Sequence, residues 1–489
     1  MSTIKARAIN SLKWTTLFSV YITISNSLGL IIKSRFLSPE QFGGLSILML
    51  FIGFFQVFSD MGISQAIIKK ERVVDEEIST LFYFNIIISA IFGAILFFSA
   101  HILATIFNYE IITELLQLAS MIILIKGPSI LLKAILEKEL LFKTIVVVDI
   151  ISDLVLQIST LVFLINGLGL LSIVYAYILA NIVSTVIYIC FVLIKLKVKI
   201  TLTIKPKLLS PFMKFGIYVT GQSVLSYVSS RIDIIIIGMI LSPEILGIYF
   251  FGKNLLEKIH QLITTSFKKV LFPTFSKLAS NQGLLTQTYY KLCKYISLVA
   301  FPVFTGAALT AHLFVPLIFG EQWKSSVVVV QVFSVFLILK LITDKLTISL
   351  LYAKDKPNYV FFTNLFTTSV YIFSLFLFSK YELLGVIISY SLFTLYRSLI
   401  FEHLANKILQ GSFSHLISIF REAFIGTLIM TTFAAGFYFV SKNIENQIFL
   451  LSGVIIISVI SYFLSVKILA KETIEALISV VKKRIIPQR

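Results

Sequence analysis

The sequence predicts an all-α integral membrane protein, with about fourteen transmembrane helices in two six-helix lobes and two further helices at the C-terminus. Three observations support this prediction: a low content of charge, many apolar stretches long enough to cross a bilayer, and a motif that occurs twice. Only 13% of the 489 residues are charged and 57% are hydrophobic, whereas soluble domains carry about 25% charged residues. So little charge cannot cover a surface that faces water, and lipid is therefore the main solvent of the chain.

Apolar stretches set the number of predicted spans. A transmembrane helix needs about 20 mostly apolar residues. The basic N-terminus precedes an apolar stretch without a signal-peptide cleavage site, so we expect an uncleaved first span. The least typical stretches are the eighth, which carries several charges, and the thirteenth and fourteenth. The predicted spans are 14–34, 42–68, 78–99, 113–132, 144–165, 169–194, 215–241, 244–267, 294–318, 325–350, 358–379, 383–401, 417–440 and 447–466.

The distribution of Lys and Arg predicts the orientation of these spans. With the N-terminus in the cytoplasm, 30 of the 42 Lys and Arg fall in inward segments and only 5 at outward ends. The positive-inside rule then favours an even number of spans in a multi-pass protein, with both termini in the cytoplasm. The net charge of +18 indicates contact with anionic lipid headgroups rather than with nucleic acid.

A short motif occurs at the same place in two blocks of six predicted spans. Leu-Ser-Pro-Glu, with Gly three positions after the Glu, stands at 37–43 and again at 241–247. Ser followed by Pro is also a common helix start, with Ser as the N-cap. Two blocks with six spans each have the same orientation, which is the parallel-repeat plan of many transporters. We therefore expect an N-lobe at 1–200, a C-lobe at 201–406, and spans thirteen and fourteen with a cytoplasmic tail at 407–489.

Ionisable side chains inside the predicted spans are candidate functional residues, because each costs about 2.5–3.5 kcal/mol to insert and normally faces a cavity or a partner. Five cations could bind the phosphates of an anionic substrate, since Arg and Lys both bind phosphate. Internal ion pairs and snorkelling side chains are the alternatives. The in-span charges are Lys126, Asp149, Asp153, Arg231, Asp233, Lys253, Glu257, Lys258, Lys340, Asp344, Lys345 and Arg397, and the five candidate cations are Lys126, Arg231, Lys253, Lys340 and Arg397.

Two aspartates on the fifth predicted span form a candidate ion-coupling site. Asp149, Asp153 and Gln157 are spaced four apart and share one helix face. This stripe either binds a proton or cation, or pairs with a basic residue of a neighbouring helix such as Lys126. The same spacing favours local ion pairs for Lys340 with Asp344 and for Lys253 with Glu257.

Metal and cofactor chemistry has no support in the sequence. The two cysteines are isolated and His is scarce, so no cluster has the spacing of a metal site or of a disulfide framework. A phosphate loop of the type found in ATP-driven pumps is also absent from the sequence. We therefore expect no metal and no cofactor.

The motif residues resemble a known family. Residues 35–43, followed by Ser-Asp-Met-Gly at 59–62, look like the opening of polysaccharide-exporting flippases of the Wzx type. In the second block, the residues around Arg231, Gly238 and Asn254 look like that family's seventh and eighth spans. The resemblance covers spans one to twelve, and its motif positions are Pro39, Glu40, Gly43, Asp60, Gly62, Asp233, Pro243, Gly247, Tyr249 and Pro273.

This resemblance implies a member of the multidrug/oligosaccharidyl-lipid/polysaccharide exporter superfamily that works by alternating access. The implied substrate is a polyprenyl-pyrophosphate-linked oligosaccharide, carried from the inner to the outer leaflet for surface polysaccharide biosynthesis. Membrane lipids and other polysaccharide-assembly membrane proteins are the expected partners. Coupling to a proton or sodium gradient fits the superfamily.

Other functions remain open at this point. A drug or cation exporter of the same superfamily would favour carboxylates over in-span Lys and Arg, and a flippase for the peptidoglycan lipid precursor handles a similar pyrophosphate. A membrane polysaccharide polymerase would be expected to have a large outward loop with catalytic Arg or His, whereas the outward loops here are short. We therefore expect a transporter and not an enzyme.

Overall fold

The computed structural model describes residues 2–71, 73–202 and 204–471. At a few further helical positions, among them Asp344 and Lys345, the side chains lie outside the described part of the chain. Contacts divide the chain into two compact units, Met1–Phe250 and Phe251–Arg489.

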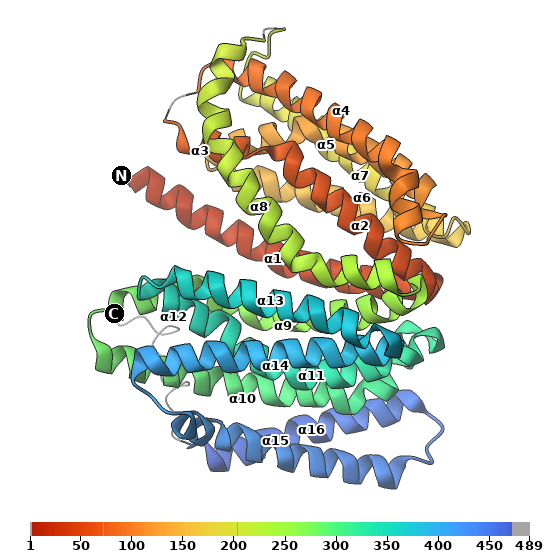
Figure 1. Ribbon diagram of the computed structural model, residues 1–489, viewed down its shortest axis with the longest axis vertical. Helices are drawn as coiled ribbons and strands as arrows, with labels where there is room; N and C mark the ends of the chain where they lie inside the picture. Colours follow the sequence, from red (N-terminus) through yellow and green to blue (C-terminus); the bar gives the residue numbers. More distant parts are fainter. Residues whose placement is uncertain (1, 72, 203, 472–489) are drawn as a thin grey trace. The chain divides into compact units, whose positions relative to one another are not determined.

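The first unit is a helical bundle in which α4 lies beside α5 and α6 beside α7 (Figure 1). Helix α1 packs on α6, and α2 packs between α5 and α8. The start of α9 also belongs to this unit. Its helices are α1 (Ser2–Phe36), α2 (Pro39–Asp60), α3 (Ile63–Lys69), α4 (Asp75–Ile106), α5 (Ile112–Lys138), α6 (Phe142–Ile165), α7 (Leu171–Cys190), η1 (Phe191–Lys195), α8 (Pro206–Ile240) and α9 (Pro243–Leu278).

The second unit is also helical, and α15 and α16 form a pair that packs on α10 (Figure 1). Helix α14 packs on α13 and α11. The helices of this unit are α10 (Gln282–Phe314), η2 (Val315–Phe319), η3 (Glu321–Ser326), α11 (Val327–Ile342), η4 (Thr343–Thr347), α12 (Ile348–Ala353), α13 (Pro357–Phe378), η5 (Ser379–Tyr381), α14 (Glu382–Leu409), α15 (Phe413–Ser441) and α16 (Gln447–Leu469).

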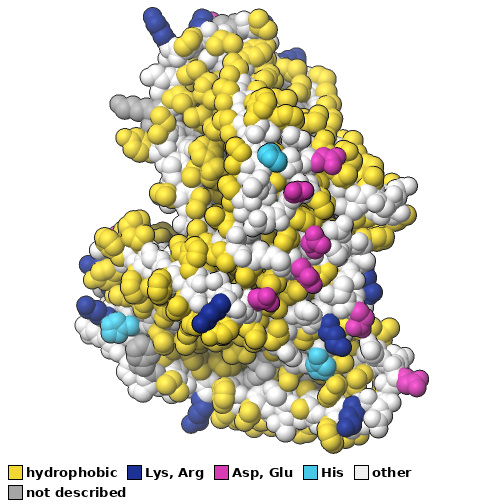
Figure 2. Space-filling view, turned by 45° about the vertical axis from the view of Figure 1, so that its right-hand side comes forward, with side chains coloured by type: hydrophobic (Ala, Val, Ile, Leu, Met, Phe, Trp, Pro, Cys, Tyr) yellow, Lys and Arg dark blue, Asp and Glu magenta, His cyan; other side chains and the backbone are white. Residues whose placement is uncertain are grey.

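The predicted all-α membrane class is confirmed. Among the described residues, 12 helical segments are long and apolar enough to span a membrane, and large hydrophobic side chains cover much of the surface (Figure 2). One of these segments, Pro357–Leu409, contains both α13 and α14, and α9 is not among the 12. The predicted count of fourteen is therefore not confirmed, although each predicted span coincides with helical residues.

Helix α8 belongs to the first unit by contact, although the sequence predicts that it opens the second lobe. It packs along α2, α3 and α4. The division into lobes at 1–200 and 201–406 stays a prediction about which parts move together.

The second predicted span, 42–68, lies within one candidate membrane span, Pro39–Lys69, but a turn divides it into two helices. Helix α2 ends at Asp60, and α3 begins at Ile63. Between them Met61 and Gly62 have positive φ angles of 43° and 67°. The Asp60 carboxylate accepts hydrogen bonds from the backbone N–H of Ser64 at 3.2 Å and from its hydroxyl at 2.5 Å. The N-cap residue of α3 is Gly62, which supplies a left-handed turn and has no side chain, so the motif aspartate at the end of α2 caps a backbone N–H in the first turn of α3 instead.

Both copies of the repeated motif start a helix. In the first copy, Ser38 and Gln41 form a capping box in which each side chain accepts from the other's backbone N–H, at 3.2 and 3.1 Å. Pro39 is the first residue of α2, and Pro243 is the first residue of α9. In the second copy, the Ser242 hydroxyl accepts from a backbone N–H at 3.4 Å. Both copies place Pro where its missing N–H costs nothing.

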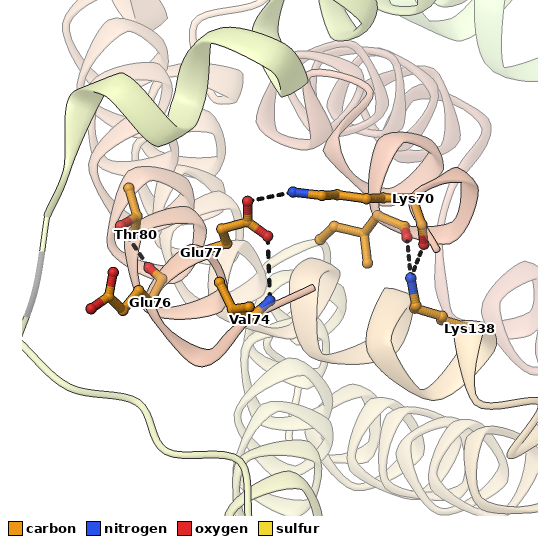
Figure 3. Close-up of polar contacts among 7 residues, drawn as sticks. Lys70, Val74, Glu76, Glu77, Thr80 and Lys138 are labelled. Carbon is orange, nitrogen blue, oxygen red and sulfur yellow. Dashed lines mark hydrogen bonds and ion pairs between the residues drawn. The ribbon is translucent and has the colours of Figure 1, made fainter. Parts of the chain in front are cut away.

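Charged residues fix the connection between α3 and α4 (Figure 3). Lys70 pairs with Glu77, which also accepts from the backbone N–H of Val74 at 3.3 Å. From the end of α5, Lys138 donates to the carbonyl oxygens of Ile67, at 3.1 Å, and Lys70. A cation at a helix C-terminus satisfies carbonyl groups that lack partners within the helix. Some of the basic residues that set the predicted orientation therefore also have structural roles.

Candidate functional site

A polar chamber of about 380 Å³ lies inside the first unit, between α2, α5, α6 and α7. Four charged side chains line it: Lys126 and Lys133 from α5, and Asp149 and Asp153 from α6. The structure thus brings one predicted cation together with both predicted ion-coupling aspartates.

Asp149 is neutralised by an ion pair between α5 and α6. The Lys133 ammonium lies 2.8 Å from one carboxylate oxygen, and the Tyr188 hydroxyl of α7 donates to the other at 2.8 Å. The sequence suggested Lys126 as the basic neighbour and ended the fourth predicted span at residue 132, one residue before Lys133. Helix α5 instead continues to Lys138, and Lys133 lines the chamber.

Asp153 has a different environment, built from hydroxyl groups of α1. Its carboxylate is 7% exposed and accepts hydrogen bonds from Tyr21, at 2.9 Å, and from Ser25. On its own helix, Gln157 donates to the other oxygen at 3.3 Å. Among the described residues, none of its hydrogen-bond donors is a cation. The sequence analysis did not identify Tyr21 and Ser25 as partners of Asp153. Their spacing of four residues, which places both hydroxyl groups on one face of an apolar span, was the available signal.

Lys126 is the chamber cation without a carboxylate partner. Its ammonium donates to the side-chain oxygen of Gln56 on α2 at 2.9 Å, and the salt bridges found in the described part of the chain do not include it. A neutral amide leaves the positive charge uncompensated. The chamber can therefore offer this charge to an anion.

Arg231 and Asp233 point in different directions along α8. Asp233 is 3% exposed and accepts a hydrogen bond from Tyr249 of α9, both being motif residues. Arg231 is half-buried and forms no hydrogen bond or ion pair with any residue that the structure describes. It does not line the chamber.

The three candidate cations of the second unit each have partners there. Lys253 lies 3.8 Å from Glu257, which is the ion pair that their spacing favours. Lys340 donates to the Tyr390 hydroxyl at 3.5 Å. The Arg397 guanidinium donates to Asn364 at 3.3 Å and lies over the ring of Phe401 at 5.2 Å.

The predicted pair of Lys340 with Asp344 falls on a side chain outside the described residues. None of the three second-unit cations lines the first-unit chamber. Within the part of the chain that the structure describes, no group of three His, Cys, Asp or Glu residues could hold a metal ion.

One buried carboxylate was missed altogether. Glu402 lies one residue beyond the end of the predicted twelfth span, 383–401, and so was not counted among the in-span charges. Helix α14 continues to Leu409, and Glu402 is 4% exposed inside the second unit.

Comparison with known sequences gives a family match and several distant relatives. A family described as "Polysaccharide biosynthesis protein" matches residues 32–328. An uncharacterized membrane protein in the cps region of Klebsiella pneumoniae is 28% identical over 353 residues, or 72% of each chain. Lipopolysaccharide biosynthesis protein WzxC of Escherichia coli (strain K12) is 23% identical over 76% of this chain and 74% of its own. Teichuronic acid biosynthesis protein TuaB of Bacillus subtilis (strain 168) is 22% identical over 91% and 92%.

Comparison with solved structures shows the fold. The lipid II flippase MurJ in an inward closed conformation matches with a TM-score of 0.72 at 16% identity, covering 94% of this chain and all of that one. An inward-facing multidrug resistance MATE transporter of the MOP superfamily matches with a TM-score of 0.64 at 16% identity, covering 81% and 96%. The chain therefore has the fold of these transporters.

Proposed function

Since the chain belongs to the polysaccharide biosynthesis protein family, we propose that it is a flippase for polyprenyl-pyrophosphate-linked oligosaccharide. It carries this substrate from the inner to the outer leaflet of the cytoplasmic membrane for surface polysaccharide biosynthesis. The observation that carries the proposal is Lys126, a cation without a carboxylate partner in a polar chamber of a transporter fold. A buried cation held by a neutral amide is suited to bind an anionic substrate.

The candidate cations divide into two groups by environment. Lys126 and Arg231 form no ion pair with a described residue and are the first choices for binding the pyrophosphate. Lys253, Lys340 and Arg397 have carboxylate, hydroxyl, amide or aromatic partners in the second unit. Each of these three must leave its partner to bind substrate, so we rank them second.

The two chamber aspartates also differ in their suitability for ion coupling. Lys133 already neutralises Asp149, whereas Asp153 is held by hydroxyl and amide donors. Protonation of Asp149 would disrupt its salt bridge with Lys133, whereas Asp153 can take up a proton without loss of an ion pair in the described part of the chain. Asp153 is therefore the preferred coupling residue, and Asp149 fixes the position of Lys133 beside Lys126.

Two alternatives share the fold. A drug or cation exporter would use the chamber carboxylates for its substrate, but Lys133 already pairs with Asp149, and Lys126 adds a positive charge that repels a cation. A flippase for the peptidoglycan lipid precursor is related through MurJ, and its substrate also carries pyrophosphate. The relatives named for lipopolysaccharide and teichuronic acid biosynthesis favour a surface polysaccharide. The proposal also includes interaction with other polysaccharide-assembly membrane proteins. It places both termini of the chain in the cytoplasm.

The test is the accessibility of lipid-linked oligosaccharide in a strain that lacks this protein. We expect intact oligosaccharide to accumulate on the inner leaflet, unlabelled by an outer-side probe, and the wild-type gene to restore labelling. Lys126→Ala should fail to restore it while inserting normally, and Lys126→Arg should restore part of it. Lys324→Ala, at an exposed position of η3, is the control. Normal labelling without the protein, in a strain with no second flippase, contradicts the proposal.

A further inference from the structure

Glu402 is a buried carboxylate that the proposed function does not use. It lies on α14, in the second unit, and faces α10 and η4 through its contacts. Its only polar contact with a described side chain is the Tyr289 hydroxyl of α10, 3.2 Å from Oε2 and 3.4 Å from Oε1. An ionised carboxylate without a cation at such a site is costly, because burial removes its hydration.

Among the side chains that the structure describes on the surrounding helices, no salt bridge supplies a cation to Glu402. On α10, Tyr290 and the buried Cys293 are neutral, and Lys294 is paired with Glu422 at 2.8 Å. Lys340 of α11 and Arg397 of α14 have the partners given above, and the side chains of Asp344 and Lys345 lie outside the described part of η4. Within the described part of the chain, Glu402 forms no hydrogen bond except the one with Tyr289.

A pair of hydroxyl groups can accommodate Glu402 in either protonation state. The Tyr289 hydroxyl lies 2.8 Å from the Thr347 hydroxyl of η4, and either oxygen can donate. With Glu402 ionised, Thr347 donates to Tyr289 and Tyr289 donates to the carboxylate. With Glu402 protonated, the acid donates to Tyr289 and Tyr289 donates to Thr347. The π-helical turn η4, which supplies Thr347, is a feature often found at functional sites.

A hollow of about 720 Å³ lies at the ends of α10, α14 and α15, beyond the part of α14 that follows Glu402. Tyr290 and His415 line this hollow, and their rings lie edge to face with centroids 4.6 Å apart. The Tyr290 hydroxyl donates to the side-chain oxygen of Asn406 at 3.1 Å. Asn406 is one helical turn from Glu402, and its buried amide nitrogen has no partner within the described residues. A hollow of this volume admits water.

We propose that Glu402 is a proton-binding site of the second unit, in exchange with water in this hollow through Tyr290 and Asn406. In uptake, a proton from water adds to a carboxylate oxygen and forms an O–H bond, and release reverses that step. A single carboxylate with one hydroxyl neighbour suits a proton, because metal cations such as Ca²⁺ take six or more oxygen ligands. The site is separate in sequence and in environment from Asp153. Only the use of this proton in transport rests on the proposed function.

The test is infrared spectroscopy of the purified full-length protein over a pH series, in lipid vesicles without substrate. We expect a carbonyl band from a protonated carboxylic acid that the isosteric Glu402→Gln variant lacks. Glu422→Gln, at the partly exposed carboxylate that pairs with Lys294, should keep the band. Tyr289→Phe should shift its frequency, because one hydrogen bond is lost, and this variant keeps Glu402 in place.

Three results overturn the proposal. Superimposable spectra of the wild type and Glu402→Gln at every pH mean that Glu402 stays ionised. A band that persists undiminished as the pH rises means that Glu402 does not release its proton. A band that disappears in Glu422→Gln belongs to Glu422. None of these results bears on whether the protein moves a lipid-linked substrate, so failure of this inference leaves the proposed function untouched.

Discussion

Gly43 packs against the backbone of Pro243 so closely that a Cβ atom on Gly43 would lie 1.9 Å from the Pro243 carbonyl oxygen. The converse contact is equally tight, since a Cβ atom on Gly247 would lie 1.7 Å from the Pro39 carbonyl oxygen. Each copy of the repeated motif thus presents its Gly to the Pro of the other copy. This close approach of backbone to backbone explains why the motif contains Gly at that position.

The first prediction concerns this contact. Gly43→Ala forces the backbones of α2 and α9 apart, and overpacking of this kind costs about 1–3 kcal/mol. We expect a lower unfolding temperature of the purified protein. Gly221→Ala is the matched control, because a Cβ atom there has no neighbour within 4 Å and Ala is the better helix former. Equal stability of the two variants would show that the contact is not tight in the membrane.

The second prediction concerns the break between α2 and α3. Asp60→Ala removes the cap of α3 and should cost about 0.5–2 kcal/mol of unfolding free energy. Asp60→Asn keeps an oxygen acceptor for Ser64 and should stay within a few tenths of a kcal/mol of the wild type, since Asn and Asp cap about equally well. Glu110→Ala, at an exposed acidic position, controls for the loss of charge. If Asp60→Asn loses as much unfolding free energy as Asp60→Ala, Asp60 has a role other than capping.

The sequence predicted the helical class and most helix positions well, because hydropathy follows contact with lipid. It predicted helix ends poorly, since a helix can continue past its apolar stretch wherever polar residues face protein. Lys133 and Glu402 were both misplaced for that reason. The break at Met61 was also missed, because apolar residues continue on both sides of it.

The sequence also did not predict which side chains of different helices contact each other. The spacing of Asp149 and Asp153 correctly indicated one polar face, and that of Lys253 and Glu257 an ion pair. Which side chains meet that face depends on how α1 and α5 are rotated about their axes. Hydropathy does not determine such rotations, so neither Tyr21 nor Lys133 was predicted as a partner.

The third prediction concerns Lys133, the ion-paired lysine of the chamber, and separates its structural role from the substrate-binding role proposed for Lys126. Lys133→Met leaves Asp149 without its cation, and breaking a buried pair costs about 3–5 kcal/mol. Because Lys133 is 37% exposed, we expect a smaller loss of about 1–3 kcal/mol, in the range of measured couplings between contacting residues.

The double variant Lys133→Met with Asp149→Asn should recover stability, because the uncompensated carboxylate is gone. Unfolding of the purified variants measures both changes. Additive losses in the double variant would mean that the two side chains do not act as a pair.

The last prediction tests ion coupling at Asp153. Vesicles containing the purified protein and extracted lipid-linked oligosaccharide are given a proton gradient or, separately, a sodium gradient, and transfer between leaflets is followed by labelling. Asp153→Asn preserves an acceptor for Tyr21 and Ser25 but does not ionise. We therefore expect its rate to fall to the rate measured without a gradient.

Asp149→Asn is the matched variant for this test, on the same helix and in the same chamber. Lys133 already cancels the charge of Asp149, so this variant should still respond to the gradient even if its absolute rate falls. The opposite pattern, with Asp153→Asn responsive and Asp149→Asn unresponsive, would move the coupling site to the Lys133–Asp149 pair. A response to sodium alone would mean that Asp153 binds a cation, with the hydroxyl groups of α1 as its further oxygen ligands.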